Sequence, residues 1–268
     1  MKENQNWGYT ETTLQKRIEI HDKYSKYEIN DWILSKLKLK PGEKILDIGC
    51  GNGKQALLYA KVAGQSGEVY GIDIAQDLLD EAKSKSSTEN LKINFINYDA
   101  NNPLPFEDKK FDVISCCFSI YYYTDVEKTL SEMKRVLRHG GRIFIAGPTV
   151  ENAHEMLAVY AKIMGKKISQ IREERMRDEI IPLIKKIFSD VSVEVFENPI
   201  EFPDSETFLY YFSSTLLLKE SSQNPQDMKK KLDSIKGEID EIIQTNKKFT
   251  VTKYVYGISG FKKNNSSI

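Results

Sequence analysis

Short apolar runs that alternate with helix-like stretches are the feature that most limits the possible fold. Helical periodicity separates most of the runs, as over Ala75–Lys83 and Val126–Leu137. Strands separated by helices predict a doubly wound α/β fold, with a parallel sheet covered by helices on both faces. The five predicted strands of this part are Lys44–Ile48, Glu68–Ile74, Ile93–Tyr98, Phe111–Cys117 and Arg142–Ala146.

The pattern changes after Pro148. Two further segments, Val191–Phe196 and Phe249–Phe261, alternate as strands do. Two late strands with a helical insertion between them predict a sheet edge that carries a helical lid. We therefore divide the chain into an N-terminal helical segment (1–40), an α/β core (41–198), a helical cap insertion (199–248), and the final strand with its tail (249–268). The late helices are predicted at Glu151–Met164, Ile168–Phe188, Ser205–Leu218 and Asp227–Ile243.

Composition narrows the class of partner. Among 268 residues, 39 Lys and Arg balance 39 Asp and Glu, so the net charge is zero. A nucleic-acid binder normally carries a basic excess, and a membrane span needs about 18 consecutive apolar residues. We find neither, and no targeting segment, so we expect neither nucleic acid nor a membrane as a partner. Three cysteines cannot build a disulfide framework, which favours a cytoplasmic location. The oligomeric state stays open.

A glycine loop follows the first predicted strand and opens a helix. It reads Asp47-Ile48-Gly49-Cys50-Gly51-Asn52-Gly53. A dinucleotide fingerprint would need a glycine at the position of Lys54, and the carboxylate of Asp47 would repel a pyrophosphate. The spacing of a P-loop is also absent. An acidic residue at this place suits a ligand that carries positive charge.

The loop resembles the first motif of class I S-adenosylmethionine-dependent methyltransferases, an acidic residue followed by x-G-x-G-x-G. Four later segments resemble further motifs of that family: Asp73 after the second strand, Asp99 after the third, FDVISCCFSIYYYTD around the fourth, and LRHGG before the fifth. The resemblance implies a seven-stranded sheet with a reversed last strand, and S-adenosyl-L-methionine as cofactor. The cofactor contacts that it implies are Asp47, Gly49, Cys50, Gly51, Gly53, Asp73, Ile74, Asp99, Ala100, Cys117 and Phe118.

Two of these acidic residues also have simpler interpretations. Asp73 could cap the following helix, and Asp99 could form a turn with its own backbone. The cysteines are expected to be apolar fillers, and no metal site is expected because the chain has no C-x-x-C and no cluster of histidines.

The sequence indicates the residues around the methyl acceptor less clearly. Tyr121 and Tyr122 follow the fourth strand, where the family places residues that face the substrate. His154 and His21 are candidates for acid–base catalysis, whereas His139 is expected before the fifth strand, at the wrong end of the sheet. The resemblance implies methyl transfer to an oxygen, nitrogen or carbon atom of a small molecule. A protein or RNA methyltransferase, or a non-catalytic subunit that binds S-adenosylmethionine, are the alternatives.

Overall fold

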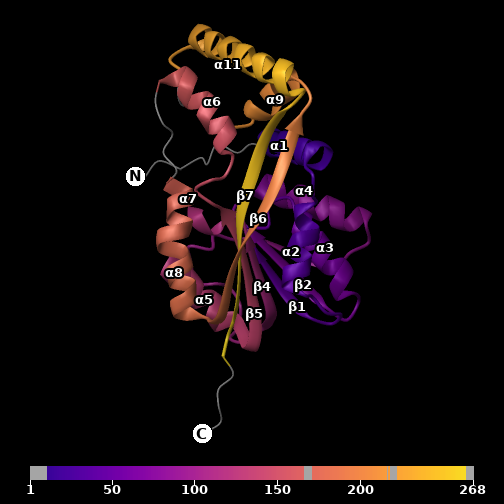
Figure 1. Cartoon of the computed structure of the whole chain (residues 1–268). Coiled ribbons are helices and arrows are strands. Elements are labelled where there is room, and N and C mark those ends of the chain that lie inside the picture. Colours follow the sequence, from indigo (N-terminus) through magenta and orange to yellow (C-terminus); the bar gives the residue numbers. More distant parts are fainter. Residues whose placement is uncertain (1–10, 166–170, 216, 218–221, 264–268) are drawn as a thin grey trace. The chain divides into compact units, whose positions relative to one another are not determined.

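The chain folds into two compact units, each built from segments that are far apart in the sequence. The computed structural model describes residues 11–165, 171–215, 217 and 222–263. The sheet unit contains the described residues of Ile29–Val150, Gln170–Phe196 and Tyr254–Ile268. The helical unit contains those of Met1–Glu28, Glu151–Ser169 and Glu197–Lys253. Figure 1 labels the helices and strands of both units.

One sheet of seven strands organises the sheet unit, and its order is β3-β2-β1-β4-β5-β7-β6. Strands β1 to β5 are parallel to their neighbours, and β7 pairs antiparallel with β5. The predicted fold class, including the reversed last strand, is therefore confirmed. The strands are β1 (Lys44–Ile48), β2 (Glu68–Asp73), β3 (Ile93–Asn97), β4 (Phe111–Cys117), β5 (Leu137–Pro148), β6 (Ser189–Phe202) and β7 (Phe249–Phe261).

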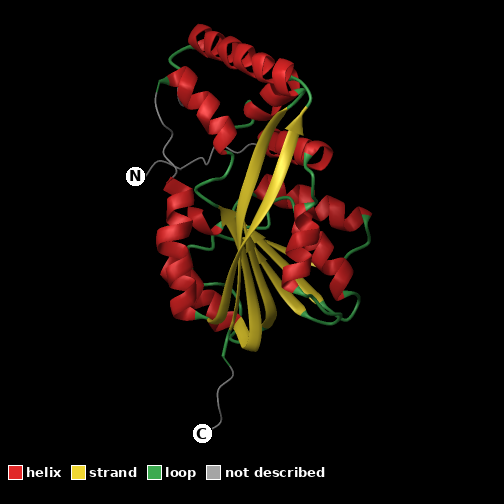
Figure 2. Ribbon diagram, in the orientation of Figure 1, coloured by secondary structure: helices red, strands yellow, loops and turns green. Residues whose placement is uncertain are grey.

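Helices cover both faces of the sheet, as Figure 2 shows for this unit. Because side chains alternate along a strand, Ile45 joins one apolar core and Leu46 joins another. The core of Ile45 is completed by α2 and α3, and that of Leu46 by α5 and α8. The helical elements of this unit are α2 (Ile29–Leu37), α3 (Lys54–Ala63), α4 (Gln76–Thr88), η1 (Ile120–Tyr122), α5 (Val126–Val136), α7 (Ile171–Arg175), the π-helix η2 (Met176–Ile180) and α8 (Ile181–Ile187).

The predicted and observed strands agree most closely at β1, β4 and β7, whose bounds are identical. Strands β6 and β5 differ most: β6 spans Ser189–Phe202 rather than Val191–Phe196, and β5 begins at Leu137 rather than at Arg142. Backbone pairing continues past the apolar run, since the Gly140 amide donates to the carbonyl of Lys262 at 2.9 Å. His139 therefore lies inside β5 rather than before it. Its position at the amino end of the strand is as expected.

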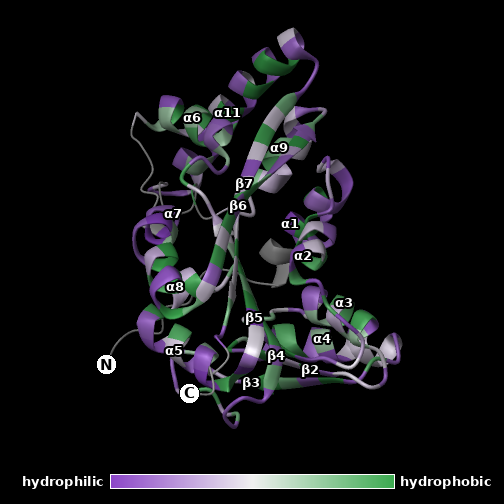
Figure 3. Ribbon diagram, turned by 60° about the horizontal axis from the view of Figure 1, so that its bottom comes forward, coloured by the Kyte–Doolittle hydropathy of each residue, from purple (hydrophilic) through white to green (hydrophobic). Residues whose placement is uncertain are grey.

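The helical unit has its own apolar core, to which Phe202, Phe208, Phe212 and others contribute. Figure 3 shows that the ribbon of α11 alternates between hydrophilic and hydrophobic stretches. Its buried residues Ile235 and Ile239 are four apart, so they lie on one face of the helix. The unit combines parts of β6 and β7 with α1 (Glu11–Tyr24), α6 (His154–Met164), α9 (Ser205–Phe212) and α11 (Pro225–Asn246).

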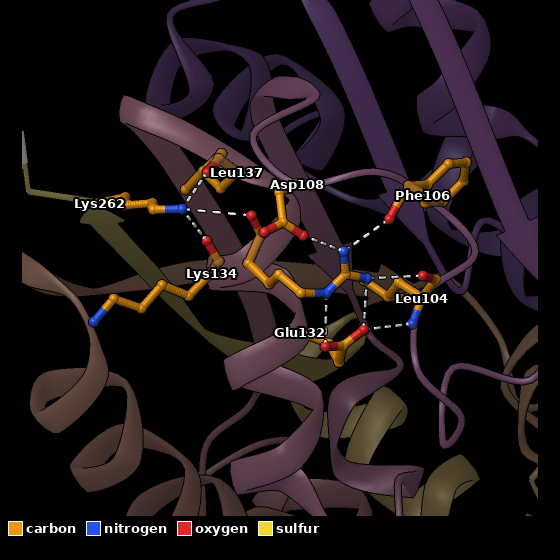
Figure 4. A network of polar contacts seen from close by, with 8 residues as sticks. Leu104, Phe106, Asp108, Glu132, Lys134, Leu137 and Lys262 are labelled. Carbon is orange, nitrogen blue, oxygen red and sulfur yellow. Dashed lines mark hydrogen bonds and ion pairs between the residues drawn. The ribbon is translucent and has the colours of Figure 1, made fainter.

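A dense polar network stabilises the sheet unit where β4 and β5 begin (Figure 4). Arg135, near the end of α5, donates at 2.8 Å to both carboxylate oxygens of Glu132 and to Asp108. It also donates to the carbonyl oxygens of Leu104 at 2.9 Å and Phe106 at 2.8 Å. The guanidinium thus connects α5 with the loop that leads into β4.

Lys262, directly after β7, completes this network. Its ammonium group donates to the carbonyl oxygens of Lys134 at 2.6 Å and Leu137 at 2.7 Å. These carbonyls lie at the end of α5, where a helix leaves acceptors without partners. Lys262 therefore fixes the end of the last strand to the end of a helix that precedes it by more than a hundred residues.

Candidate active site

The glycine loop joins β1 to α3 at the carboxyl end of the parallel strands, the edge at which such sheets bind ligands. The amides of Gly49 and Cys50 donate to the carbonyl oxygen of Ile72, at 2.8 and 3.1 Å. These bonds hold the loop against the end of β2. The loop and the residues that follow β2 thus form one connected structure.

Gly49 makes the closest approach in the loop. Its φ is 70°, a left-handed conformation that favours glycine. A Cβ atom there would lie 2.4 Å from the side chain of Ser119 and 3.2 Å from the hydroxyl of Tyr123. Neither of those residues was among the predicted contacts, although both belong to the motif around the fourth strand. The loop is therefore packed directly against the turn that follows β4.

The other two motif glycines serve different purposes. A Cβ at Gly53 would meet Ala82 of α4 at 2.9 Å, so this glycine permits close packing of the helices. A Cβ at Gly51 would have a single neighbour within 4 Å, Leu78 at 3.9 Å. The backbone at Gly51 is consequently open to a ligand on the side where a side chain would stand.

Asp47 is a buried carboxylate that lacks a full set of partners. Its side chain belongs to a residue only 2% exposed, and Oδ2 has no hydrogen-bond partner within the described structure. Burial raises its pKa to about 7; a hydrogen bond from Ser115 lowers it and the charge of Asp73 raises it. Buried polar atoms are normally satisfied. The orphaned oxygen therefore marks a place for a hydrogen-bond donor or a cation.

Asp73 connects the glycine loop with the start of α4. Its Oδ2 accepts from the amide of Gly51 at 2.8 Å, and its Oδ1 accepts from Ala75 at 2.9 Å. Burial raises the pKa of this carboxyl, while the amide hydrogen bonds oppose the shift. A carboxylate offers about four acceptor sites. Asp73 can therefore accept further hydrogen bonds while it holds both amides.

The residues predicted beside an adenine lie next to Asp73. Ile74 is 62% exposed, which is unusual for a large apolar side chain and leaves a hydrophobic face open. The Tyr98 amide donates to the carbonyl of Asp73 at 2.9 Å, which brings Asp99 and the buried Ala100 to the same edge. Asp99 uses Oδ1 to accept from the Asn101 amide at 2.9 Å, so the predicted local turn is present.

The end of β4 carries backbone strain. Phe118 has a φ of 61°, a conformation that is rare for a bulky side chain and costs on the order of 1–3 kcal/mol. Cys117 and Cys50 are buried, and burial raises the pKa of both thiols. These thiols are therefore neutral and unsuited to nucleophilic attack. Directly after the left-handed backbone at Phe118, Ser119 lies against Gly49.

Three consecutive tyrosines follow the strained residue. Tyr121 and Tyr123 are almost completely buried, and Tyr122 is partly exposed. The rings of Tyr121 and Tyr122 lie 4.6 Å apart, and the Tyr122 hydroxyl accepts from Arg172 at 3.0 Å. Arg172 and its neighbour Arg175 were not predicted. They lie on α7, about fifty residues further along the chain, and no sequence motif marks them.

The two candidate histidines belong to the helical unit rather than to the unit that carries the glycine loop. His21 lies on α1 with Nδ1 3.2 Å from the hydroxyl oxygen of Ser25. His154 begins α6, is exposed, and has Nδ1 3.2 Å from the carbonyl of Glu151. Both side chains have local contacts that explain their positions without a catalytic role.

The described residues, 11–165, 171–215, 217 and 222–263, also bear on a metal site and on a membrane-spanning helix. Among these residues, no group of three or more His, Cys, Asp or Glu side chains could hold a metal ion. In the same part of the chain, every helix is too short or too polar to cross a bilayer.

Comparison with known proteins identifies the family. The methyltransferase domain family matches residues 39–186, which include the glycine loop and the turn after β4. Demethylmenaquinone methyltransferase of Staphylococcus aureus is 35% identical over 150 residues, 53% of this chain and 61% of that protein. The chain thus spans about three fifths of the length of this relative.

Solved structures share the fold at low sequence identity. A phosphoethanolamine N-methyltransferase of Haemonchus contortus, in complex with S-adenosyl-L-methionine, has a TM-score of 0.60 and 19% identity; the match covers 97% of this chain and 59% of that one. A SAM-dependent methyltransferase of Aquifex aeolicus has a TM-score of 0.53 and 20% identity, with 68% and 88% covered. The predicted resemblance is confirmed: the chain belongs to the methyltransferase domain family and has the fold of the class I S-adenosylmethionine-dependent enzymes.

Proposed function

We propose that this chain transfers a methyl group from S-adenosyl-L-methionine to a small-molecule acceptor. The observation that carries the proposal is the orphaned, buried Oδ2 of Asp47 beside a glycine loop that is open at Gly51. A phosphate-bearing ligand would be repelled by that carboxylate, whereas a cationic one would satisfy it. S-adenosylmethionine carries an ammonium and a sulfonium group and no phosphate.

The residues present at this edge suit the rest of the cofactor as well. Asp73 has acceptor capacity left for ribose hydroxyls, and the exposed Ile74 offers an apolar face for the adenine ring. Asp99 and Ala100 would contact the adenine edge. Gly49, Cys50, Gly51 and Gly53 would form the backbone that lies along the cofactor, and Cys117 and Phe118 would lie beside its methionine end.

Bound S-adenosylmethionine supplies an electrophilic methyl group. The chain's own part is to hold the acceptor in line with that group and to exclude water. Such orientation can contribute roughly 7–11 kcal/mol, so no covalent enzyme intermediate is needed. Tyr121 and Tyr122 would form one wall of the acceptor site. His21 and His154 stay candidates for proton transfer, which replacement of each by Gln would test through the pH dependence of turnover.

We do not infer the identity of the methyl acceptor from any relative. The family match ends at residue 186, so it leaves out residues 197–253 of the helical unit. The similarity to an enzyme named for demethylmenaquinone supports a small-molecule acceptor and no finer choice. The cytoplasmic location also stays a prediction, which cell fractionation would test.

Calorimetric titration with S-adenosylhomocysteine tests the cofactor part. We expect saturable one-to-one binding by the wild type, and affinity at least roughly tenfold weaker in Asp73→Ala, because about one charge-assisted hydrogen bond is lost. Asp80→Ala is the matched control, since Asp80 is an exposed residue of α4 paired with Gln76. No binding by the wild type, or equal binding by Asp73→Ala, would refute the proposal.

A labelled methyl donor separates the alternatives. Label that moves from S-adenosylmethionine into the small-molecule fraction of a cell extract would support the proposal. Label in protein or RNA would favour a macromolecular substrate. Tight binding without any transfer would favour a cofactor-binding subunit.

A further inference from the structure

The turn after β4, residues 119–123, is held from outside by one arginine. In this single 3-10 turn the carbonyl oxygens of Tyr121 and Tyr123 lie past the last helical hydrogen bonds, so they need other donors. Arg175 Nη1 donates to the carbonyl of Tyr121 at 3.1 Å and to that of Tyr123 at 2.6 Å. One guanidinium thus fixes the main chain on both sides of Tyr122.

Arg175 is itself oriented by a second residue. Its Nε and Nη2 donate to the two carboxylate oxygens of Glu179, at 2.6 and 3.3 Å. Such a two-point pair restricts the guanidinium plane, which a single ion contact would not do. The remaining nitrogen, Nη1, is thereby directed at the turn.

The segment that carries this pair is anchored in the sheet unit. Glu179 belongs to the π-helix η2, and Met176 at its start is fully buried. A Cβ at Gly147 of β5 would lie 2.7 Å from the thioether of Met176, so helix and strand are in close contact. π-Helical turns are rare and occur often at functional sites. Arg175 therefore directly precedes a helical segment that is packed against β5.

The same turn also contacts the glycine loop. Ser119 and Tyr123 are the two residues that a Cβ at Gly49 would strike. The Ser119 hydroxyl also donates to the carbonyl of Ile48 at 3.0 Å. The turn thus contacts both Arg175 and the glycine loop, and Tyr121 and Tyr122 belong to it.

We propose that Arg175, oriented by Glu179, is a positioning residue of the active site: it fixes the turn 119–123, and through it both the tyrosine wall of the acceptor site and the packing against the glycine loop. The inference concerns the site named in the proposed function and rests on that function for its catalytic meaning. Arg175 contacts the main chain of the turn, so its effect on any ligand is indirect.

Hydrogen–deuterium exchange of peptides covering residues 118–125 tests this inference without an acceptor. In Arg175→Met the amides of Tyr122 and Tyr123, which donate within the turn to the carbonyls of Ser119 and Ile120, should exchange roughly tenfold faster, because the hydrogen bonds that anchor the turn are lost. Arg177→Met is the matched control, since Arg177 lies in the same helical segment but pairs with exposed Asp178. Arg175→Lys keeps a donor for the carbonyls and should recover part of the protection.

Affinity for S-adenosylhomocysteine provides the second measurement. Arg175→Met should bind it several-fold more weakly than the wild type, and Arg177→Met should bind it equally well. Unchanged exchange over 118–125 in folded Arg175→Met would overturn the inference. If Arg175→Met fails to fold, Glu179→Gln replaces it, and unchanged exchange there would have the same meaning. Faster exchange in a protein whose wild type does not bind S-adenosylhomocysteine would refute the proposed function alone.

Discussion

Buried polar groups are hydrogen-bonded to different extents at the two ends of the parallel strands in the sheet unit. Where β4 and β5 begin, Arg135 and Glu132 have their hydrogen bonds made within the protein. At the carboxyl ends, Asp47 is more deeply buried, and one of its oxygens has no hydrogen-bond partner among the residues that the structure describes. A satisfied network contributes to stability, whereas an unsatisfied buried charge costs stability unless a ligand completes it. The polar network where β4 and β5 begin is therefore structural, whereas we propose that the unpartnered oxygen of Asp47 serves binding.

Among the variants that test this comparison, Asp47→Asn should change the free energy of unfolding most, and it should raise stability at alkaline pH. The folded-state pKa of about 7 lies above the ordinary value of 3.8, so the folded protein holds an extra proton between these values. The stability from this proton is present in acid and is lost as the pH rises through 7. At about pH 8 the variant should be on the order of 4 kcal/mol more stable than the wild type, and at about pH 4 the two should be similar.

Urea unfolding at the two pH values measures this difference. Asp80→Asn, an exposed change on α4, should track the wild type at both. A difference between Asp47→Asn and the wild type that does not depend on pH would contradict the assignment of a raised pKa. The same variant should bind S-adenosylhomocysteine more weakly, so that stability and binding change in opposite directions.

Gly49→Ala should be the next largest change. A left-handed alanine costs roughly 1–2 kcal/mol, and overpacking against Ser119 adds to it, for a total of about 3 kcal/mol. Gly237→Ala is the control, because nothing lies within 4 Å of its Cβ position in helix α11. That variant should gain about 0.5–1 kcal/mol. Thermal unfolding that ranks Gly49→Ala at or above Gly237→Ala would show that the loop is not tightly packed.

Arg135→Met should lower stability by about 2 kcal/mol, since Glu132 and two carbonyl oxygens lose their donor. Arg138→Met should cost less than about 1 kcal/mol, because its partner is Asp112 and the arginine side chain is half exposed. Urea unfolding compares the two. Affinity for S-adenosylhomocysteine should be unchanged in both, and a loss in Arg135→Met would remove the functional distinction between the two ends of the sheet.

Several parts of the fold could be predicted because their signals are local. The bounds of β1, β4 and β7 follow from runs of apolar or alternating residues, which report directly on burial. The early start of β5 could not be predicted, because residues 138–141 are polar or glycine. Backbone pairing recruits this segment: Leu137 pairs with Phe111 of β4, and Gly140 and Gly141 exchange hydrogen bonds with Lys262 after β7. Hydrogen bonds between distant main-chain atoms do not require particular side chains, so the sequence pattern does not indicate them.

In the candidate site, too, some residues could be predicted from the sequence and others could not. The motif predicted Asp47 and Asp73, since each lies at the carboxyl end of a predicted strand. It did not predict Ser119 or Tyr123 as neighbours of Gly49, and nothing in the sequence indicated Arg175.

By itself the sequence determined the parallel sheet, the glycine turn and the acidic residues that accompany it, because periodicity and the conformational freedom of glycine act within a few residues. Only the tertiary structure decided that one oxygen of Asp47 has no partner in the described part of the chain and that an arginine on α7 fixes the turn after β4. Both depend on which distant segments come into contact, and such contacts are set by packing of the whole unit.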